Sequence, residues 1–134
     1  MNETHVVTCF VESDGKVLIL KRSGSVSSYQ QKWAGISGYI ETGKTAVQQA
    51  WQELGEEAGL NSENAVLIKK GEVLVVNDEV MEKRWIVHPF RFNIADKNEI
   101  TLDWEQSDHT WIAPEQILHY NTVPGLYEAW EKVK

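Results

Sequence analysis

One helical pattern among strand-like runs limits the folds that this chain can adopt. Between residues 45 and 58, apolar residues recur at the spacing of a single helix face: Val47, Ala50, Trp51, Leu54 and Ala58. Gly59 follows as a helix stop. Runs with strand composition lie before and after this segment. One amphipathic helix between strands predicts an α/β domain of the α+β kind, with the helix on one face of a sheet.

The strand-like runs predict most of the sheet. Residues 6–12 and 16–21 predict a hairpin, because Asp14-Gly15 between them suits the positive φ angles of a tight turn. Two long strands are expected over residues 65–76 and 84–95, joined around Asn77-Asp78. Pro89 cannot donate a ladder hydrogen bond, so an edge or a bulge is expected there. Two short strands and two closing helices complete the prediction, over residues 100–102, 110–113, 114–119 and 124–133.

Two segments predict loops. Residues 22–32 are rich in serine and predict a loop. Residues 33–43 contain Gly35, Gly38 and Gly43 and predict a turn-rich segment whose backbone amides can approach a ligand closely.

Length and charge narrow the class of protein. The chain has 134 residues, which suits one domain over residues 1–134. Its net charge of −7 argues against binding to a nucleic-acid polymer, which needs a basic face. An anionic small molecule remains open as a ligand, because a bound divalent metal can reverse the local field.

The sequence also carries expectations about location. Cys9 is the one cysteine and cannot form an internal disulfide, so we expect a small buried side chain there. The first residues lack the pattern of a secretion signal, and no apolar run approaches a membrane-spanning length. We therefore expect a cytoplasmic protein without a membrane partner.

Three glutamates on the predicted helix suggest a site for a divalent cation. Glu53, Glu56 and Glu57 fall within one arc beside the apolar face, so their carboxylates repel one another unless a cation lies between them. Mg²⁺ prefers such oxygen ligands, and a glycine-rich segment leading into a helix favours bound phosphate. A glutamate-rich helix face that is merely solvated is the alternative.

The order of these residues resembles the Nudix box, written G-x5-E-x7-R-E-U-x-E-E-x-G-U with U an aliphatic residue. Residues 38–60 match seven of its nine specified positions: Gly38, Glu53, Leu54, Glu56, Glu57, Gly59 and Leu60. Lys44 stands in place of the first glutamate, and Gln52 in place of the arginine.

The resemblance implies a MutT-like fold, an α/β/α sandwich with a mixed central sheet. It further implies a Mg²⁺-dependent hydrolase, with Mn²⁺ as an alternative metal, that cleaves a phosphoanhydride bond in a nucleotide-like small molecule. The implied catalytic and metal-binding residues are Glu53, Glu56 and Glu57, with the carbonyl near Ser37-Gly38 as a further ligand. A carboxylate outside the box completes the set, for which Glu105 is the candidate and Glu99 and Asp103 are alternatives.

The two departures from the box leave the activity open. In the family, the first glutamate and the arginine form an ion pair that braces the loop against the helix. Lys44 and Gln52 cannot form that pair, and the loss of both partners avoids a stranded buried charge. The alternative functions are therefore a Nudix-fold nucleotide sensor with weak or no catalysis, and a partner-binding domain that keeps an acidic helix.

Substrate contacts are predicted around the box. Lys21 and Arg22 end a strand near the expected groove and are candidates for phosphate binding, with Arg84 and Arg91 as weaker ones. Gly38 and Tyr39 lie in the box loop and are also expected near the ligand. Further aromatic residues could stack on a base or fill the core: Trp33, Trp85, Trp104 and Trp111. Nucleoside triphosphates and nucleotide sugars both remain open as substrates, and the resemblance implies a homodimer.

Overall fold

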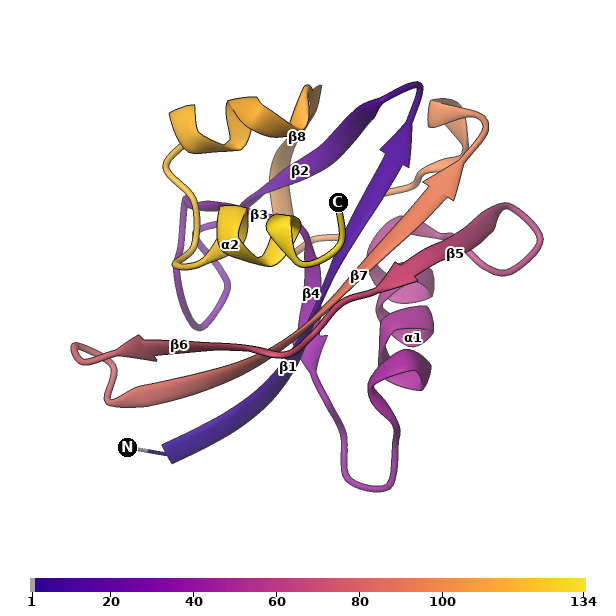
Figure 1. Cartoon of the computed structure of the whole chain (residues 1–134). Coiled ribbons are helices and arrows are strands. Elements are labelled where there is room, and N and C mark those ends of the chain that lie inside the picture. The colour runs from indigo at the N-terminus through magenta and orange to yellow at the C-terminus, as the bar shows by residue number, and fades with distance from the viewer. Residues whose placement is uncertain (1) are drawn as a thin grey trace.

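Two long parallel strands form the centre of the molecule in the computed structural model, which describes residues 2–134 (Figure 1). They are β1 (Asn2–Ser13) and β7 (Lys83–Ile94), and they pair in register from Asn2–Lys83 to Glu12–Asn93. The sheet order is β3-β2-β1-β7-β5, with β4 on β1, β8 on β2 and β6 on β7. The other strands are β2 (Lys16–Arg22), β3 (Trp33–Ala34), β4 (Ile36–Tyr39), β5 (Ala65–Lys70), β6 (Leu74–Asp78) and β8 (Gln106–Ile112). The sheet is therefore mixed, as predicted.

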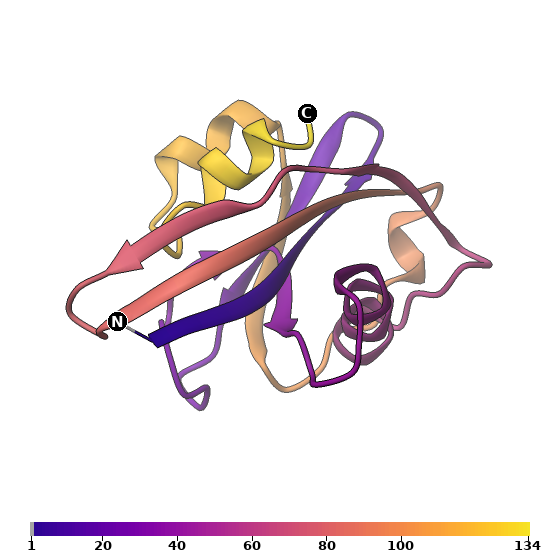
Figure 2. The ribbon, with the colours of Figure 1, turned by 60° about the horizontal axis from the view of Figure 1, so that its bottom comes forward.

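Helices cover both faces of this sheet. Helix α1 (Ala46–Ala58) lies on one side, and α2 (Leu126–Glu131) lies on the other with the 3-10 segment η2 (Pro114–His119), as Figure 2 shows. A further 3-10 turn, η1 (Lys97–Glu99), follows β7. The three layers confirm the predicted α/β/α sandwich.

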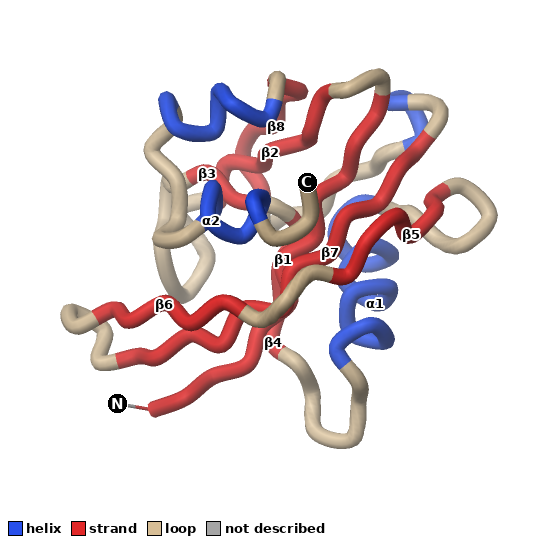
Figure 3. Tube along the Cα trace, viewed as in Figure 1, coloured by secondary structure: helices blue, strands red, loops and turns tan. Residues whose placement is uncertain are grey.

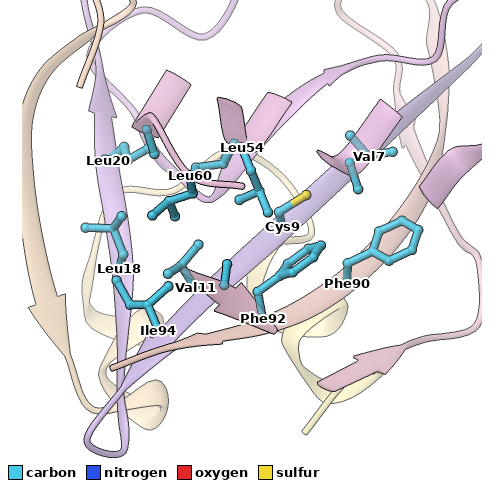
Figure 4. Close-up of a cluster of buried hydrophobic side chains, with 14 residues drawn as sticks. Val7, Cys9, Val11, Leu18, Leu20, Leu54, Leu60, Phe90, Phe92 and Ile94 are labelled. Carbon is cyan, nitrogen blue, oxygen red and sulfur yellow. The ribbon is translucent and has the colours of Figure 1, made fainter. Parts of the chain in front are cut away.

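Each face of the sheet has its own apolar core because side chains alternate along a strand. On one face, Val7, Cys9 and Val11 of β1 pack under Leu54 and Leu60 together with buried side chains of β7 (Figure 4). On the other face, a second cluster joins β1 to α2 and η2, with members Phe10, Val17, Ile19, Trp85, Val87, Ile112, Ile117, Leu126, Ala129, Trp130 and Val133. Cys9 is fully buried, as predicted.

Helix α1 begins and ends where the sequence predicts. The Thr45 side chain caps the N-terminus of the helix by accepting from the Gln48 amide. In return, the Thr45 amide donates to the Gln48 side-chain oxygen. Gly59 ends the helix at a φ of 67°, a left-handed conformation that glycine adopts without strain.

The predicted hairpin is present at its turn, but its two strands do not stay paired beyond the turn. Asp14 and Gly15 both have positive φ, and β1 and β2 pair at Glu12–Val17 and Ser13–Lys16. The strands then diverge, and β1 pairs with β4 at residues 6–9 instead. The prediction of a turn-rich segment over residues 33–43 was therefore wrong for its first half, which forms β3 and β4, as the secondary-structure view in Figure 3 shows. Its glycines allow close backbone approach, since a Cβ on Gly35 would lie 2.9 Å from the Cys9 carbonyl oxygen.

The predicted strand over residues 65–76 is two strands, β5 and β6, which lie end to end along β7. The break between them is opposite Pro89, which has no N–H to donate, while its carbonyl accepts from the Gly71 amide. Pro89 thus marks an irregularity, as expected, but β7 lies at the centre of the sheet rather than at an edge. Asn77 and Asp78 belong to β6, and the turn follows them over residues 79–82.

The strand predicted over residues 100–102 is absent, because this segment bonds to the helix instead of the sheet. The Thr101 amide donates to the Ala58 carbonyl at 2.8 Å and so satisfies the end of α1. The last two helical predictions were correct in place, although residues 114–119 form a 3-10 helix and α2 is shorter than expected. Within residues 2–134, no helix has the length and apolar character needed to cross a membrane.

Candidate active site

The buried side of α1 carries two carboxylates one helical turn apart. Glu53 is 9% exposed and Glu57 is 3% exposed, whereas Glu56 points to solvent. The sequence predicted all three at the edge of a groove, but the structure buries Glu57 more deeply than the other two. The position of each follows from helical spacing, since residues 53 and 57 share the face that also carries Leu54 toward the sheet.

Gly38 allows this helix face to approach β4. A Cβ on Gly38 would overlap the Glu53 carboxylate, so any other residue at this position would displace that side chain. The glycine at the start of the box and the first glutamate on its helix therefore meet in space, although they are far apart along the segment.

Burial raises the pKa of both carboxyl groups, so it favours their protonated forms in the absence of a cation. Loss of solvent raises the pKa of Glu57 well above its usual range, and the neighbouring Glu53, Glu105 and Asp103 raise it further. Burial also raises the pKa of Glu53, although bonds from Glu57 and Gln49 oppose the shift. The two carboxyl groups lie close enough to share a proton. A cation placed between them would replace that proton.

The donor set fits a hard divalent cation. One oxygen of Glu57, Oε2, is buried and accepts from no N–H or O–H donor of the described chain, so only a shared proton or a cation can meet it. In the part of the chain that the structure describes, no three His, Cys, Asp or Glu side chains form a preassembled metal-binding group. A carboxylate pair with open positions is the arrangement in which Mg²⁺ keeps several waters and takes oxygens from a substrate phosphate.

Two amide side chains orient these carboxylates, and the sequence analysis did not single them out. Gln49 is 1% exposed and donates from Nε2 to Glu53 Oε1 at 3.0 Å. Gln106, on β8, donates from Nε2 to Glu57 Oε1 at 2.7 Å. The available signal for Gln49 was its position four residues before Glu53 on the same helix face. For Gln106, which lies 49 residues from Glu57, the sequence holds no comparable signal.

A cavity of about 470 Å³ opens beside the carboxylate pair. Its lining includes six of the predicted site residues: Arg22, Gly38, Tyr39, Glu53, Glu56 and Glu105. The side chains of Lys21 and Glu57 are not part of the lining. The cavity therefore joins the acidic residues of the helix to a basic residue from the end of β2.

Glu105 faces the carboxylate pair from the loop before β8. Burial raises its pKa, as do Asp103 and Glu53, while the nearby Arg22 lowers it. Its backbone carbonyl accepts from the Ser23 amide at 2.8 Å, which ties this loop to the end of β2. Of the two alternatives, Asp103 accepts from the Glu105 amide at 3.0 Å, and Glu99 lies in η1.

Aromatic rings also line the cavity. Tyr29, Tyr39, Trp85 and Trp104 all contribute to its lining. The rings of Tyr29 and Tyr39 each lie 6.2 Å from the Trp85 ring, and Tyr39 and Trp104 are 52% and 66% exposed. A planar base would find large apolar surfaces here, two of them free to adjust.

Tyr29 connects the 23–32 loop to the sheet. Trp85 donates from Nε1 to the Tyr29 hydroxyl at 3.0 Å, and that hydroxyl donates to Asp78 on β6. Burial and the bond to Asp78 raise the pKa of Tyr29 to about 12. These bonds thus fasten a loop that lines the cavity to β6 and β7.

The remaining candidates lie outside the cavity. Trp33 packs edge-on against Tyr120 beside the second core cluster, and Trp111 packs against the first. Arg84 pairs with Glu3, and Arg91 forms a part-buried ion pair with Glu12 at 2.8 Å. These side chains are engaged in the fold.

Comparison with known proteins gives one family and one fold. The family model described as "NUDIX domain" matches residues 1–132. A curated relative is the nucleoside triphosphatase NudI of Escherichia coli O139:H28, which is 20% identical over 130 residues, 90% of this chain and 89% of the relative.

Solved structures share the architecture at low sequence identity. The MutT protein from Methanosarcina mazei Go1 superposes with a TM-score of 0.80 at 20% identity, over 96% of this chain and 91% of that one. An Ap4A hydrolase of C. elegans superposes with a TM-score of 0.79 at 16% identity, over 96% of this chain and 93% of that one. At these identities the likeness establishes the fold.

Proposed function

The chain belongs to the NUDIX family of hydrolases, and we propose that it uses Mg²⁺ to cleave a phosphoanhydride bond in a nucleoside triphosphate or a related nucleoside diphosphate derivative. The observation that carries this proposal is the buried Glu53–Glu57 pair, with an oxygen on Glu57 that no N–H or O–H donor reaches, beside a cavity lined in part by aromatic rings. The pair suits a cation, and the cavity suits a nucleotide.

The metal, when bound, would neutralise charge that develops on the phosphoryl oxygens. Glu53 and Glu57 would hold it, with Glu56 and Glu105 as further ligands from the edge of the cavity. Mn²⁺ offers similar oxygen-ligand chemistry and is the expected substitute.

The protein side chains would divide the remaining work. Arg22 donates from Nε to the Ser28 carbonyl at 3.0 Å, a bond that orients its guanidinium beside the cavity, where it can bind a phosphate. Tyr39, Trp85 and Trp104 would hold the base. Glu53 or Glu105 would accept a proton from the attacking water, since both pKa values are raised toward the neutral range.

The names of similar proteins suggest which classes of substrate to test first. One relative is named as a nucleoside triphosphatase, and one structural neighbour as an Ap4A hydrolase. We therefore place nucleoside triphosphates first, with dinucleoside polyphosphates and nucleotide sugars as competitors for the same cavity.

The test is turnover of that panel with and without Mg²⁺, for the natural chain and for Glu57→Gln. Glu63→Gln is the matched control, because Glu63 is exposed beyond the end of α1. We expect Mg²⁺-dependent release of phosphate or pyrophosphate that is lost in Glu57→Gln and kept in Glu63→Gln. Equal turnover by Glu57→Gln would refute the site.

Other outcomes would identify the alternatives. Tight nucleotide binding without product at saturating Mg²⁺ would replace the hydrolase with a nucleotide sensor. Binding of neither metal nor nucleotide would indicate a domain that binds another partner. The homodimer and the cytoplasmic location stay predictions, and light scattering tests the first of them.

A further inference from the structure

The loop between β4 and α1 is bonded to the helix through Glu41. The Glu41 amide donates to Gln49 Oε1 at 3.0 Å, and Gln52 Nε2 donates to Glu41 Oε2 at 2.6 Å. The backbone and the side chain of one loop residue therefore each meet a glutamine of α1.

Each glutamine also donates a hydrogen bond to a carboxylate of the candidate site. Gln49 Nε2 donates to Glu53 Oε1 at 3.0 Å, and Gln52 Nε2 donates to Glu56 Oε1 at 2.9 Å. Two parallel chains of hydrogen bonds thus run from Glu41 to the helix carboxylates, each one crossing a single helical turn.

We propose that Glu41 is a positioning residue that orients Glu53 and Glu56 through Gln49 and Gln52. This inference rests on the proposed function, since Glu53 and Glu56 need a fixed orientation only if they bind a metal. Glu41 does not line the cavity, so it acts through the glutamines rather than on the substrate.

The burial of Gln49 supports this role. An amide side chain that is 1% exposed beside an apolar core is costly unless both its oxygen and its nitrogen are bonded. Here the oxygen accepts from the loop and the nitrogen donates to Glu53, so the side chain joins two elements and fixes which Glu53 oxygen is occupied. A residue needed only to fill the core would be apolar.

The network also accounts for the two departures from the Nudix box. The pair expected between residues 44 and 52 is absent, but Gln52 finds an acidic partner at Glu41, and Lys44 Nζ lies 3.4 Å from the same Glu41 oxygen. The acidic group that contacts residue 52 therefore lies at residue 41, three residues before position 44, and the loop is bonded to the helix.

The experiment measures Mn²⁺ binding by electron paramagnetic resonance in the absence of substrate. We expect Gln49→Met to weaken Mn²⁺ binding about 10-fold or more, as for groups that orient metal ligands, and Glu41→Ala, which removes the bond to Gln52 but not the backbone bond to Gln49, to weaken it by up to about 10-fold. Glu63→Ala is the control and should bind Mn²⁺ like the natural chain. Thermal unfolding of each variant without metal separates a lost fold from a lost orientation.

Kinetics supply a second readout. Because Glu41 lies outside the cavity, Glu41→Ala should lower kcat and raise the Mg²⁺ concentration for half activity, with KM for the nucleotide changed by less than about 2-fold. A rise in KM for the nucleotide, without a change in the Mg²⁺ concentration for half activity, would overturn the inference.

A rescue variant tests the network against a general structural role. Adding Lys44→Glu and Gln52→Arg to Glu41→Ala places an acidic residue opposite a basic one at positions that the network already joins. We expect Mn²⁺ affinity to return to within about 2-fold of the natural chain, because an ion pair replaces the lost hydrogen bonds. Mn²⁺ affinity unchanged by Glu41→Ala, or not recovered by the rescue, would refute the role of Glu41.

The two proposals can fail separately. If the natural chain binds Mn²⁺ but hydrolyses no nucleotide, the hydrolase fails and the Mn²⁺ comparison still decides on Glu41. If the natural chain binds no Mn²⁺, both are refuted together.

Discussion

Replacing Glu57 by glutamine should stabilise the metal-free protein, and increasingly so as the pH rises. Glu57 is 3% exposed, and burial raises its pKa well above the usual range, so the folded protein keeps it protonated. The unfolded chain ionises it near pH 4.3, as in model peptides. Folding at neutral pH must therefore take up a proton, and this requirement costs free energy.

The sign and size follow from linkage. A carboxyl group whose folded pKa is raised contributes fully to stability below its unfolded pKa, and that contribution is lost as the pH rises toward the folded value. One proton changes the free energy of unfolding by at most about 1.4 kcal/mol per pH unit. A proton shared with Glu53 still counts as one proton, so we expect up to that full slope, or at most roughly 5 kcal/mol between pH 4.5 and pH 8.

Glutamine imitates the protonated carboxyl group and does not titrate. Its amide can donate toward Glu53, and its oxygen can accept from Gln106, which now donates to Glu57 Oε1. The free energy of unfolding of Glu57→Gln should therefore exceed that of the natural chain by a margin that grows with pH.

The assay is urea unfolding in EDTA at several pH values, repeated with Mg²⁺. Without metal, the free energy of unfolding of Glu57→Gln should exceed that of the natural chain by an amount that rises with pH. The free energy of unfolding of Glu63→Gln should differ from that of the natural chain by the same amount at every pH. With Mg²⁺ at about 100 times its dissociation constant, the natural chain should gain about 2.7 kcal/mol, and Glu57→Gln much less. A pH-independent difference for Glu57→Gln, or equal stabilisation of both proteins by Mg²⁺, would refute the reasoning.

Three further substitutions test the cavity. Gly38→Ala should lower the free energy of unfolding by about 1–3 kcal/mol in urea and reduce turnover, because the added Cβ overlaps the Glu53 carboxylate; a stable, active variant would contradict that geometry. Tyr29→Phe should cost about 1–3 kcal/mol, because it leaves the Trp85 N–H without its acceptor, and limited proteolysis should detect a looser 23–32 loop. Trp104→Ala should leave stability within about 0.5 kcal/mol, since the ring is 66% exposed, and should raise KM for a nucleotide at least about 5-fold. An unchanged KM would remove Trp104 from the base site.

Local patterns in the sequence predicted the parts of the fold that depend on neighbouring residues. Helix α1 was predicted from its apolar spacing and from the stop at Gly59, and the turn at Asp14-Gly15 was predicted because positive φ angles favour such residues. Helical spacing also predicted Glu53 beside the apolar face, where the structure buries it.

What the sequence did not predict depends on distant partners. Residues 33–39 form strands because β1 and β2 lie beside them, and no local signal reports that neighbour. Residues 65–78 form two strands because Pro89 faces their junction. Gln106 reaches Glu57 from β8 only after the sheet has closed.

The parallel pairing of β1 with β7 constrains how this chain can fold. His5 and His88, which bond across the two strands, are 83 residues apart in the sequence, so a long loop must close before the central pairing contributes any stability. During synthesis at about 5–20 residues per second, β1 would wait roughly 4 to 17 s for its partner. The apolar centre of β1 is exposed throughout that interval, so we expect the nascent chain to be most prone to aggregation before residue 94 has left the ribosome.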